Sequence, residues 1–96
     1  VTFESGARTH WHSHEHGQIL SVVTGYGLIC TANETPQALR PGDWVWIPPG
    51  ERHWHGAGPD TSLTHIAISL GATQWSDEVS AEEYASAPHP VEGAPQ

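Results

Sequence analysis

Cysteine, methionine and basic residues are scarce or absent in this 96-residue chain. A single cysteine, Cys30, excludes an intrachain disulfide framework. Three basic residues stand against eleven Asp and Glu, which gives a formal charge of −8 at pH 7. A surface of that sign repels nucleic acids and anionic membranes. No apolar run approaches the roughly 18 residues that a membrane helix needs. We therefore expect neither a nucleic acid nor a membrane as a partner.

The chain contains no methionine and opens on residues 1–4, which already have the character of a strand. We therefore expect the natural N-terminus to precede Val1. No targeting segment is visible, and we expect a cytoplasmic protein. Ninety-six residues suffice for one domain, near the lower limit at which a chain buries a self-sufficient core.

Short β-type runs recur about every ten residues and are separated by turn residues, a pattern typical of an all-β sandwich or barrel. Ser80 and Glu83 have the spacing of a capping box and predict one short helix near the C-terminus. We expect one domain over residues 1–84 and a proline-containing tail over 85–96. The expected strands cover residues 1–4, 9–14, 18–24, 28–32, 37–40, 44–47, 52–55 and 63–70.

Two of these strands carry apolar residues on both faces. In the last one, Ile66 and Ile68 alternate with Leu63 and Ala67, and the strand at 18–24 has the same character. A strand that is apolar on both sides in so small a protein needs a cover for its second face. We therefore expect a homodimer.

Four of the eight histidines lie within residues 10–16, and three of them follow a period of two. In a strand, His10, His12 and His14 would project from the same face. Three adjacent imidazoles repel one another when protonated and gain little from packing. The arrangement is reasonable if a divalent metal lies in front of them and holds them neutral. Further histidines follow at His53 and His55, on either side of a tryptophan, and at His65.

Two motifs resemble those of the cupin superfamily: His12-x-His14-x3-Gln18 followed by Gly25, and Gly42-x5-Pro48-x-Gly50-x2-His53. The match spans about residues 4–70. The resemblance implies a double-stranded β-helix, a jelly-roll barrel that holds one metal ion, over the domain expected at 1–84. The ligands that it implies are His12, His14, Gln18 and His53.

Shorter phrases, such as Trp11-His12-x-His14-x2-Gly17-Gln18 and Thr64-His65-Ile66-Ala67-Ile68, are similar to a group of small bacterial cupins. That group includes manganese-dependent (R)-selective hydroxynitrile lyases. The resemblance implies Mn²⁺ as the metal and a catalytic histidine at His65. Fe²⁺, Ni²⁺ and Zn²⁺ stay open, because ligand type alone does not separate these metals.

Gln18 stands where most cupins carry glutamate. An amide oxygen can ligate a metal, but it neither accepts a proton nor cancels charge, so the metal keeps its full charge as a Lewis acid. Acid–base work then falls to other groups, and histidine is the natural candidate near neutral pH. We expect His65 to do this work, with His55 and His10 as further candidates.

These observations favour a metal-dependent lyase that acts on small-molecule cyanohydrins such as mandelonitrile. One alternative is a quercetinase-like dioxygenase, which oxygen consumption would reveal. Another is a non-catalytic domain that binds a small molecule. The spare histidines beyond the ligand set speak against the last interpretation.

Overall fold

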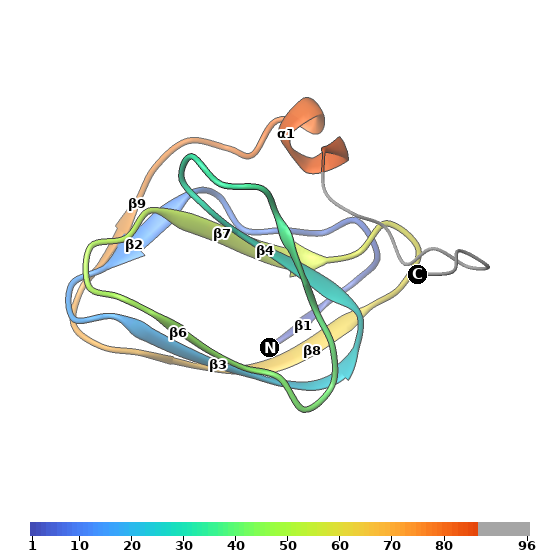
Figure 1. The fold of residues 1–96 in the computed structure, drawn as a ribbon, viewed down its shortest axis with the longest axis horizontal. Coiled ribbons are helices and arrows are strands. Elements are labelled where there is room, and N and C mark those ends of the chain that lie inside the picture. The colour runs from blue at the N-terminus through green and yellow to red at the C-terminus, as the bar shows by residue number, and fades with distance from the viewer. Residues whose placement is uncertain (87–96) are drawn as a thin grey trace.

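The computed structural model describes residues 1–86, and the chain there folds mostly into strands (Figure 1). One short helix follows the last strand. In chain order the elements are β1 (Thr2–Phe3), β2 (His12–His14), β3 (Gln18–Gly25), β4 (Gly27–Thr31), β5 (Gln37–Leu39), β6 (Trp44–Ile47), β7 (His53–Ala57), β8 (Leu63–Ser69), β9 (Thr73–Trp75) and α1 (Ala81–Ala85).

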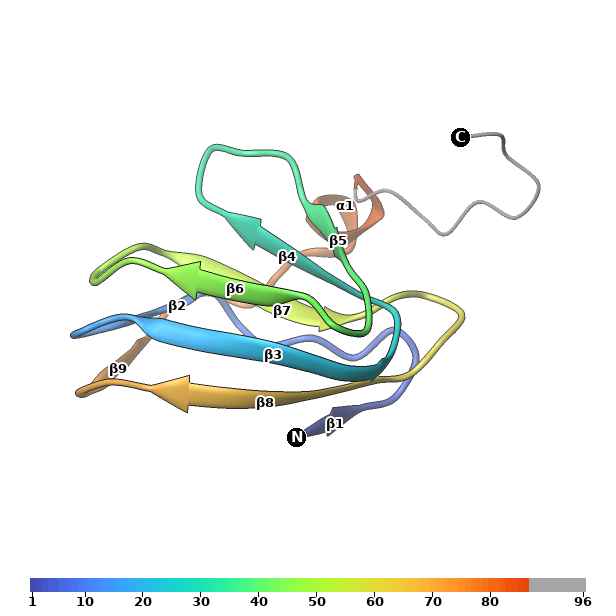
Figure 2. The ribbon, with the colours of Figure 1, turned by 60° about the horizontal axis from the view of Figure 1, so that its bottom comes forward.

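The strands form two antiparallel sheets that face each other, as in a jelly-roll barrel (Figures 1 and 2). The four-stranded sheet has the order β1-β8-β3-β6, and the five-stranded sheet has the order β5-β4-β7-β2-β9. The prediction of an all-β jelly roll with a short C-terminal helix is confirmed. Among residues 1–86, no helix has the length and apolar character to cross a membrane.

Side chains alternate between the space inside the barrel and the outside, as strand geometry requires. The inner faces of both sheets meet in one apolar cluster, which contains Leu20, Val22, Ile29, Leu39, Ile47, Ala57 and Leu63. On β7, His53 and His55 share the inner face, and Trp54 between them points outward. This alternation places imidazoles beside the apolar core.

The outer face of the five-stranded sheet is covered by the C-terminal segment. Tyr84 of α1 packs there against Trp54, and its hydroxyl donates a hydrogen bond of 2.6 Å to the Ala57 carbonyl. The predicted capping box of Ser80 and Glu83 is present at the start of the helix. The buried residues of this second cluster are Trp11, Tyr26, Leu28, Cys30, Trp54, Val79 and Tyr84.

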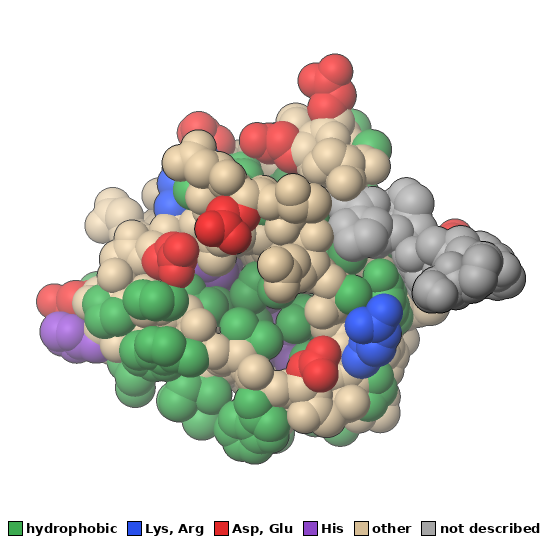
Figure 3. Space-filling model, in the orientation of Figure 1, with side chains coloured by type: hydrophobic (Ala, Val, Ile, Leu, Met, Phe, Trp, Pro, Cys, Tyr) green, Lys and Arg blue, Asp and Glu red, His purple; other side chains and the backbone are tan. Residues whose placement is uncertain are grey.

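The outer face of the four-stranded sheet is apolar and exposed among the described residues. Figure 3 shows hydrophobic side chains gathered along the lower margin of the molecule, where this sheet lies in Figure 1. The large side chains exposed here are Val23, Trp44, Trp46, Ile66, Ile68 and Leu70, at 37–71% of their full areas.

Two strands differ from expectation. The histidine strand begins at His12, because the backbone before it turns to other partners: the Thr9 amide donates to the His55 carbonyl, and the Trp11 amide to the Asp77 carbonyl. Strand β9 was not predicted, although it pairs with β2 along that strand's whole length. The tail expected from residue 85 lies, from 87 onward, outside the described residues.

Candidate metal centre

Three predicted ligands, His12, His14 and His53, meet inside the barrel. His12 lies directly opposite His53 on the neighbouring strands β2 and β7, so both project to the same face. His14 follows two residues later on that face. One nitrogen of each ring lies within 4.8 Å of the others, and no more than 3% of any of these residues is exposed. The structure thus brings together three groups that could hold a metal ion.

Gln18 reaches the same point from the opposite sheet, where it is the first residue of β3. Its Nε2 donates a hydrogen bond of 2.9 Å to the Ser69 hydroxyl, and its Oε1 lies 3.1 Å from His53 Nε2. Gly17 makes this approach possible: its φ is +98°, and a Cβ there would collide with the Trp46 ring. Ser69 therefore directs the amide oxygen toward the histidines.

Each of the three histidine rings is held by a hydrogen bond through its Nδ1 atom. His12 Nδ1 donates to the His10 carbonyl at 2.8 Å, and His53 Nδ1 donates to the Glu51 carbonyl at 2.9 Å. His14 Nδ1 is hydrogen-bonded to the Thr73 hydroxyl at 3.0 Å. A carbonyl only accepts, so in His12 and His53 the proton is on Nδ1 and the lone pair of the neutral ring is on Nε2.

The electrostatics of the group favour neutral imidazoles. Burial lowers the pKa of His12 and of His14, and it lowers the pKa of His53 to about 4. The neighbouring histidines add to the effect at His53, because a second positive charge nearby disfavours protonation. At neutral pH the three rings therefore present lone pairs.

These residues fit a divalent first-row cation. His14 Nε2 is buried and has no hydrogen-bond partner in the described chain. His53 Nε2 and Gln18 Oε1 are both acceptors, yet they face each other at 3.1 Å, an approach that a shared cation makes favourable. Imidazole nitrogen and amide oxygen are ligands that first-row metals accept.

His55 and His65 form a second buried pair beside the ligands. His65 Nε2 lies 3.2 Å from His55 Nδ1, within hydrogen-bond distance, and Phe3 makes edge contacts with both rings. His55 stacks on His53 with the ring centroids 5.7 Å apart. Burial, as the largest cause, lowers the pKa of both His55 and His65. His55 Nε2 and His65 Nδ1 have no hydrogen-bond partners among the described residues.

The structure does not bring the His10 side chain into this group. His10 lies before β2, where the chain is no longer in the strand conformation that would align its ring with His12, and it is exposed. What it contributes is its carbonyl, which holds the His12 ring. The expectation that its imidazole shares the ligand face is therefore not met.

Two supporting residues were missed from the sequence. Ser69, which orients Gln18, is in phase with His65 on β8, and that period could have identified it. Thr73, which holds His14, lies on β9 opposite that histidine. No sequence signal predicted that strand.

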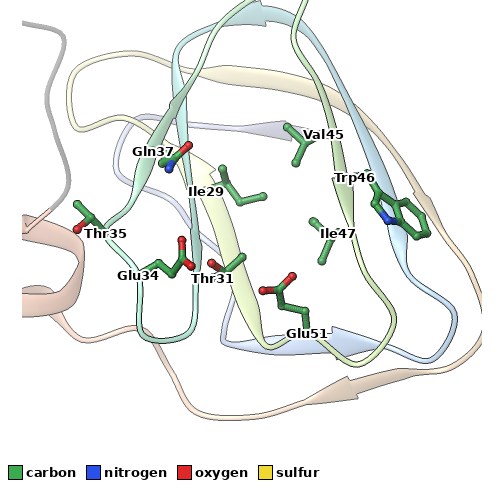
Figure 4. Close-up of a pocket in the computed structure, with 9 residues that line it drawn as sticks. All are labelled: Ile29, Thr31, Glu34, Thr35, Gln37, Val45, Trp46, Ile47 and Glu51. Atoms are coloured by element: carbon green, nitrogen blue, oxygen red, sulfur yellow. The ribbon is translucent and has the colours of Figure 1, made fainter.

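A cavity of about 250 Å³ opens between β4–β5 and β6, beside the candidate metal centre (Figure 4). Ile29, Val45 and Ile47 project toward one another across it, and the Glu51 carboxylate points toward them. Ile29 lies directly opposite His55, and Ile47 lies directly opposite Gln18. The cavity thus borders the candidate metal centre from the open edge of the barrel.

A jelly-roll barrel with a cluster of histidines in its interior is the arrangement that the cupin resemblance implies. The sequence profile of the cupin domain family matches residues 1–68, and the chain belongs to this family.

One relative carries a description of its activity. An (R)-mandelonitrile lyase from Granulicella tundricola is 47% identical over an alignment of 88 residues, and the alignment covers 88% of this chain and 67% of that protein.

Solved structures agree on the fold. A cupin-like protein from Thermotoga maritima superposes with a TM-score of 0.89 at 47% identity, over 94% of this chain and 71% of that one. A cupin protein from Bacteroides fragilis gives a TM-score of 0.67 at 27% identity, over 74% of this chain and 61% of the other.

Proposed function

We propose that this chain is a metal-dependent lyase that cleaves small cyanohydrins such as mandelonitrile, or forms them in the reverse direction. The observation that carries this proposal is the buried His55–His65 pair next to a ligand set of three histidines and one glutamine. Such a pair supplies a proton acceptor that the neutral ligand set lacks. The likeness to an (R)-mandelonitrile lyase supports the same reaction class.

The cation would be held by the Nε2 atoms of His12, His14 and His53 and by Oε1 of Gln18. We propose Mn²⁺, with Fe²⁺, Ni²⁺ and Zn²⁺ as alternatives, since the donor set suits all four. When bound, it supplies Lewis-acid chemistry at the substrate oxygen.

The proton steps fall to the histidine pair. Cleavage removes the hydroxyl proton, the oxygen electron pair forms the carbonyl, and the carbon–carbon bond breaks as cyanide leaves with its electrons. The pair accepts the hydroxyl proton and returns it to cyanide, so that an aldehyde and hydrogen cyanide are released. Burial keeps His55 and His65 neutral. When His65 Nε2 donates its proton to His55 Nδ1, the lone pair on His65 Nδ1 is free for this transfer. His65 is the residue on which we place the base, with His55 next to it sharing the proton.

The adjoining cavity is large enough for a single-ring substrate. A cavity of about 150 Å³ is enough for a benzene ring in a protein core, so about 250 Å³ accommodates one ring with its substituents.

The test is turnover of racemic mandelonitrile by the manganese-loaded protein with and without oxygen, followed by benzaldehyde release. We expect release that does not depend on oxygen and that falls at least about a hundredfold in His65→Ala, the range for loss of a general base. His16→Ala, which removes an exposed imidazole, is the matched control. Absence of release in either atmosphere would contradict the lyase assignment, and oxygen uptake would favour the dioxygenase.

We further propose that two copies associate through the exposed outer face of the four-stranded sheet. The corresponding face of the five-stranded sheet is covered by the chain's own C-terminal segment, whereas this one has no cover among residues 1–86. The outward positions carry no charge, so two copies of a protein of charge −8 can meet there without repulsion. Those positions are Ile19, Ser21, Val23, Trp44, Trp46, Thr64, Ile66 and Ile68.

A further inference from the structure

The cavity between β4–β5 and β6 adjoins the candidate metal centre, strand by strand. Thr31, Ile29 and Ile47 line it, and they lie directly opposite His53, His55 and Gln18, respectively. Directly opposed residues of an antiparallel pair project to the same face. A molecule in this cavity therefore lies one side chain away from His53 and Gln18 of the centre and from His55 beside it.

The inner wall of the cavity is apolar. Ile29 and Ile47 are buried members of the barrel core, and Val45 packs against the same cluster (Figure 4). These three aliphatic side chains offer no hydrogen-bond partner, so a polar group gains nothing by facing them. They suit the hydrocarbon part of a ligand whose polar end is directed toward the histidines.

The lining of the cavity is negatively charged. Glu51, half-buried, and Glu34, exposed, are the charged residues among those that line it. No basic side chain among the lining residues balances them, because the chain's three arginines lie over aromatic rings elsewhere. Their partners are Tyr84 for Arg8, Tyr26 for Arg40 and Trp11 for Arg52. Two carboxylates beside a small apolar space repel a ligand that brings a third.

We propose that this cavity binds the apolar body of an uncharged substrate, and that Glu34 and Glu51 exclude molecules whose ring carries a further carboxylate. The proposal rests on the proposed function for the direction of the substrate and adds the substrate class: small, uncharged, single-ring cyanohydrins and aldehydes. The centre itself keeps a positive charge when a cation is held by neutral ligands.

A second hollow, of about 340 Å³, borders His14 on another side. Its lining includes Ser13 and Gln74, which are paired across β2 and β9 and alternate with the inward-facing residues of those strands. That hollow therefore lies on the outer side of the sheet. Ala72 lines this hollow, so its methyl signal distinguishes binding there from binding in the cavity.

The isoleucines make a direct binding test possible. Two of the five, Ile29 and Ile47, line the cavity, whereas Ile19, Ile66 and Ile68 lie on the outer face of the four-stranded sheet. We would titrate the zinc-loaded protein, labelled with ¹³C at isoleucine and alanine methyls, with benzyl alcohol and with 4-(hydroxymethyl)benzoate. The two probes share the hydroxymethyl end and differ by a carboxylate at the far end of the ring.

We expect benzyl alcohol to shift the methyl signals of Ile29 and Ile47 and to leave the three outer isoleucines in place. The carboxylate probe should bind about tenfold more weakly, a difference of about 1.4 kcal/mol. The double variant Glu34→Gln/Glu51→Gln should remove most of this difference, whereas Glu82→Gln, an exposed carboxylate on α1, should not. Added salt should also reduce the difference, because it screens charge.

Three results would overturn the proposal: shifts at Ala72 in place of the two cavity isoleucines, no binding of benzyl alcohol, or equal binding of both probes. These readouts do not depend on turnover. If the cavity binds as expected and mandelonitrile is not cleaved, the cavity assignment stands and the proposed reaction fails. If mandelonitrile is cleaved and the isoleucines do not respond, the reaction stands and the cavity assignment fails.

Discussion

Acidification should destabilise the metal-free protein well above the pH at which carboxylates titrate. The reason is His53, whose pKa burial lowers from 6.5 to about 4 in the folded chain. Between these two values the unfolded chain binds a proton that the folded chain does not, so the free energy of unfolding rises with pH across this window. The stability is complete above pH 6.5 and is lost as pH falls toward 4.

The size of the effect follows from the two pKa values. At pH 5 the unfolded imidazole is almost fully protonated and the folded one is almost fully neutral, which costs the fold about 2 kcal/mol through His53 alone. His12, His14, His55 and His65 act in the same direction, since the pKa of each is lowered chiefly by burial. For a domain of this size, 2 kcal/mol is a substantial part of the total stability.

The measurement is urea unfolding of the metal-free protein, followed by tryptophan fluorescence, at pH 7.5, 6.0 and 5.0. The pH is kept at or above 5 so that Glu83 does not affect the comparison. Its pKa is lowered in the folded chain, and the stability that it provides is lost only below about pH 4.5. His53→Asn keeps an N–H near the Glu51 carbonyl and removes the titrating ring, so its pH dependence should be shallower. His16→Asn, at an exposed position, should behave as the parent. Equal stability of the parent at pH 7.5 and pH 5.0 would refute the reasoning.

Two further perturbations test the support of the centre and the outer sheet face. Ser69→Ala removes the acceptor of the Gln18 amide, so metal affinity should fall about fivefold, the equivalent of a hydrogen bond of about 1 kcal/mol. The affinity is measured by competition with a chelating dye, and Ser69→Thr should retain most of it. Unchanged affinity in the alanine variant would contradict the orienting role of Ser69. Ile66→Glu places a charge in the apolar outer face and should convert a dimer into monomers in light scattering after gel filtration, whereas Gln74→Glu on the other sheet should not. A parent protein that is already monomeric would exclude the dimer.

The histidines that meet in the barrel were predicted by two different signals. A period of two aligns His12 with His14, and the resemblance of the glycine and proline positions around His53 to a cupin motif implied the third. In the structure, the pairing of β2 with β7 places His12 opposite His53. On β8 the same period puts His65 in phase with Leu63 and Ala67, and His65 is buried.

The details that hold the centre could not be found in this way. Strand β9 is three residues long and lies in a segment without a clear alternation, and its pairing with β2 is a tertiary contact. Two of the ligand rings are held by carbonyls, of His10 and Glu51, and a carbonyl is present at every position of any sequence. The prediction for His10 was wrong because the period of two does not extend to that residue. Strand β2 begins at His12, and the His10 side chain is exposed.

Gln18 is the residue at which the chemistry of this centre can be altered with the least change of shape. Gln18→Glu introduces a carboxylate among three buried imidazoles, and the Ser69 hydroxyl, which accepts from the amide, can donate to the carboxylate instead. The added charge should hold a cation at least as tightly but should leave it a weaker Lewis acid, because one unit of its charge is cancelled. We therefore expect metal content, measured by mass spectrometry, to hold or rise while mandelonitrile turnover falls about tenfold or more, the range seen when groups around a metal are changed. Unchanged turnover at full metal content would mean that the Gln18 oxygen is not a ligand or that the charge at the centre does not limit the rate.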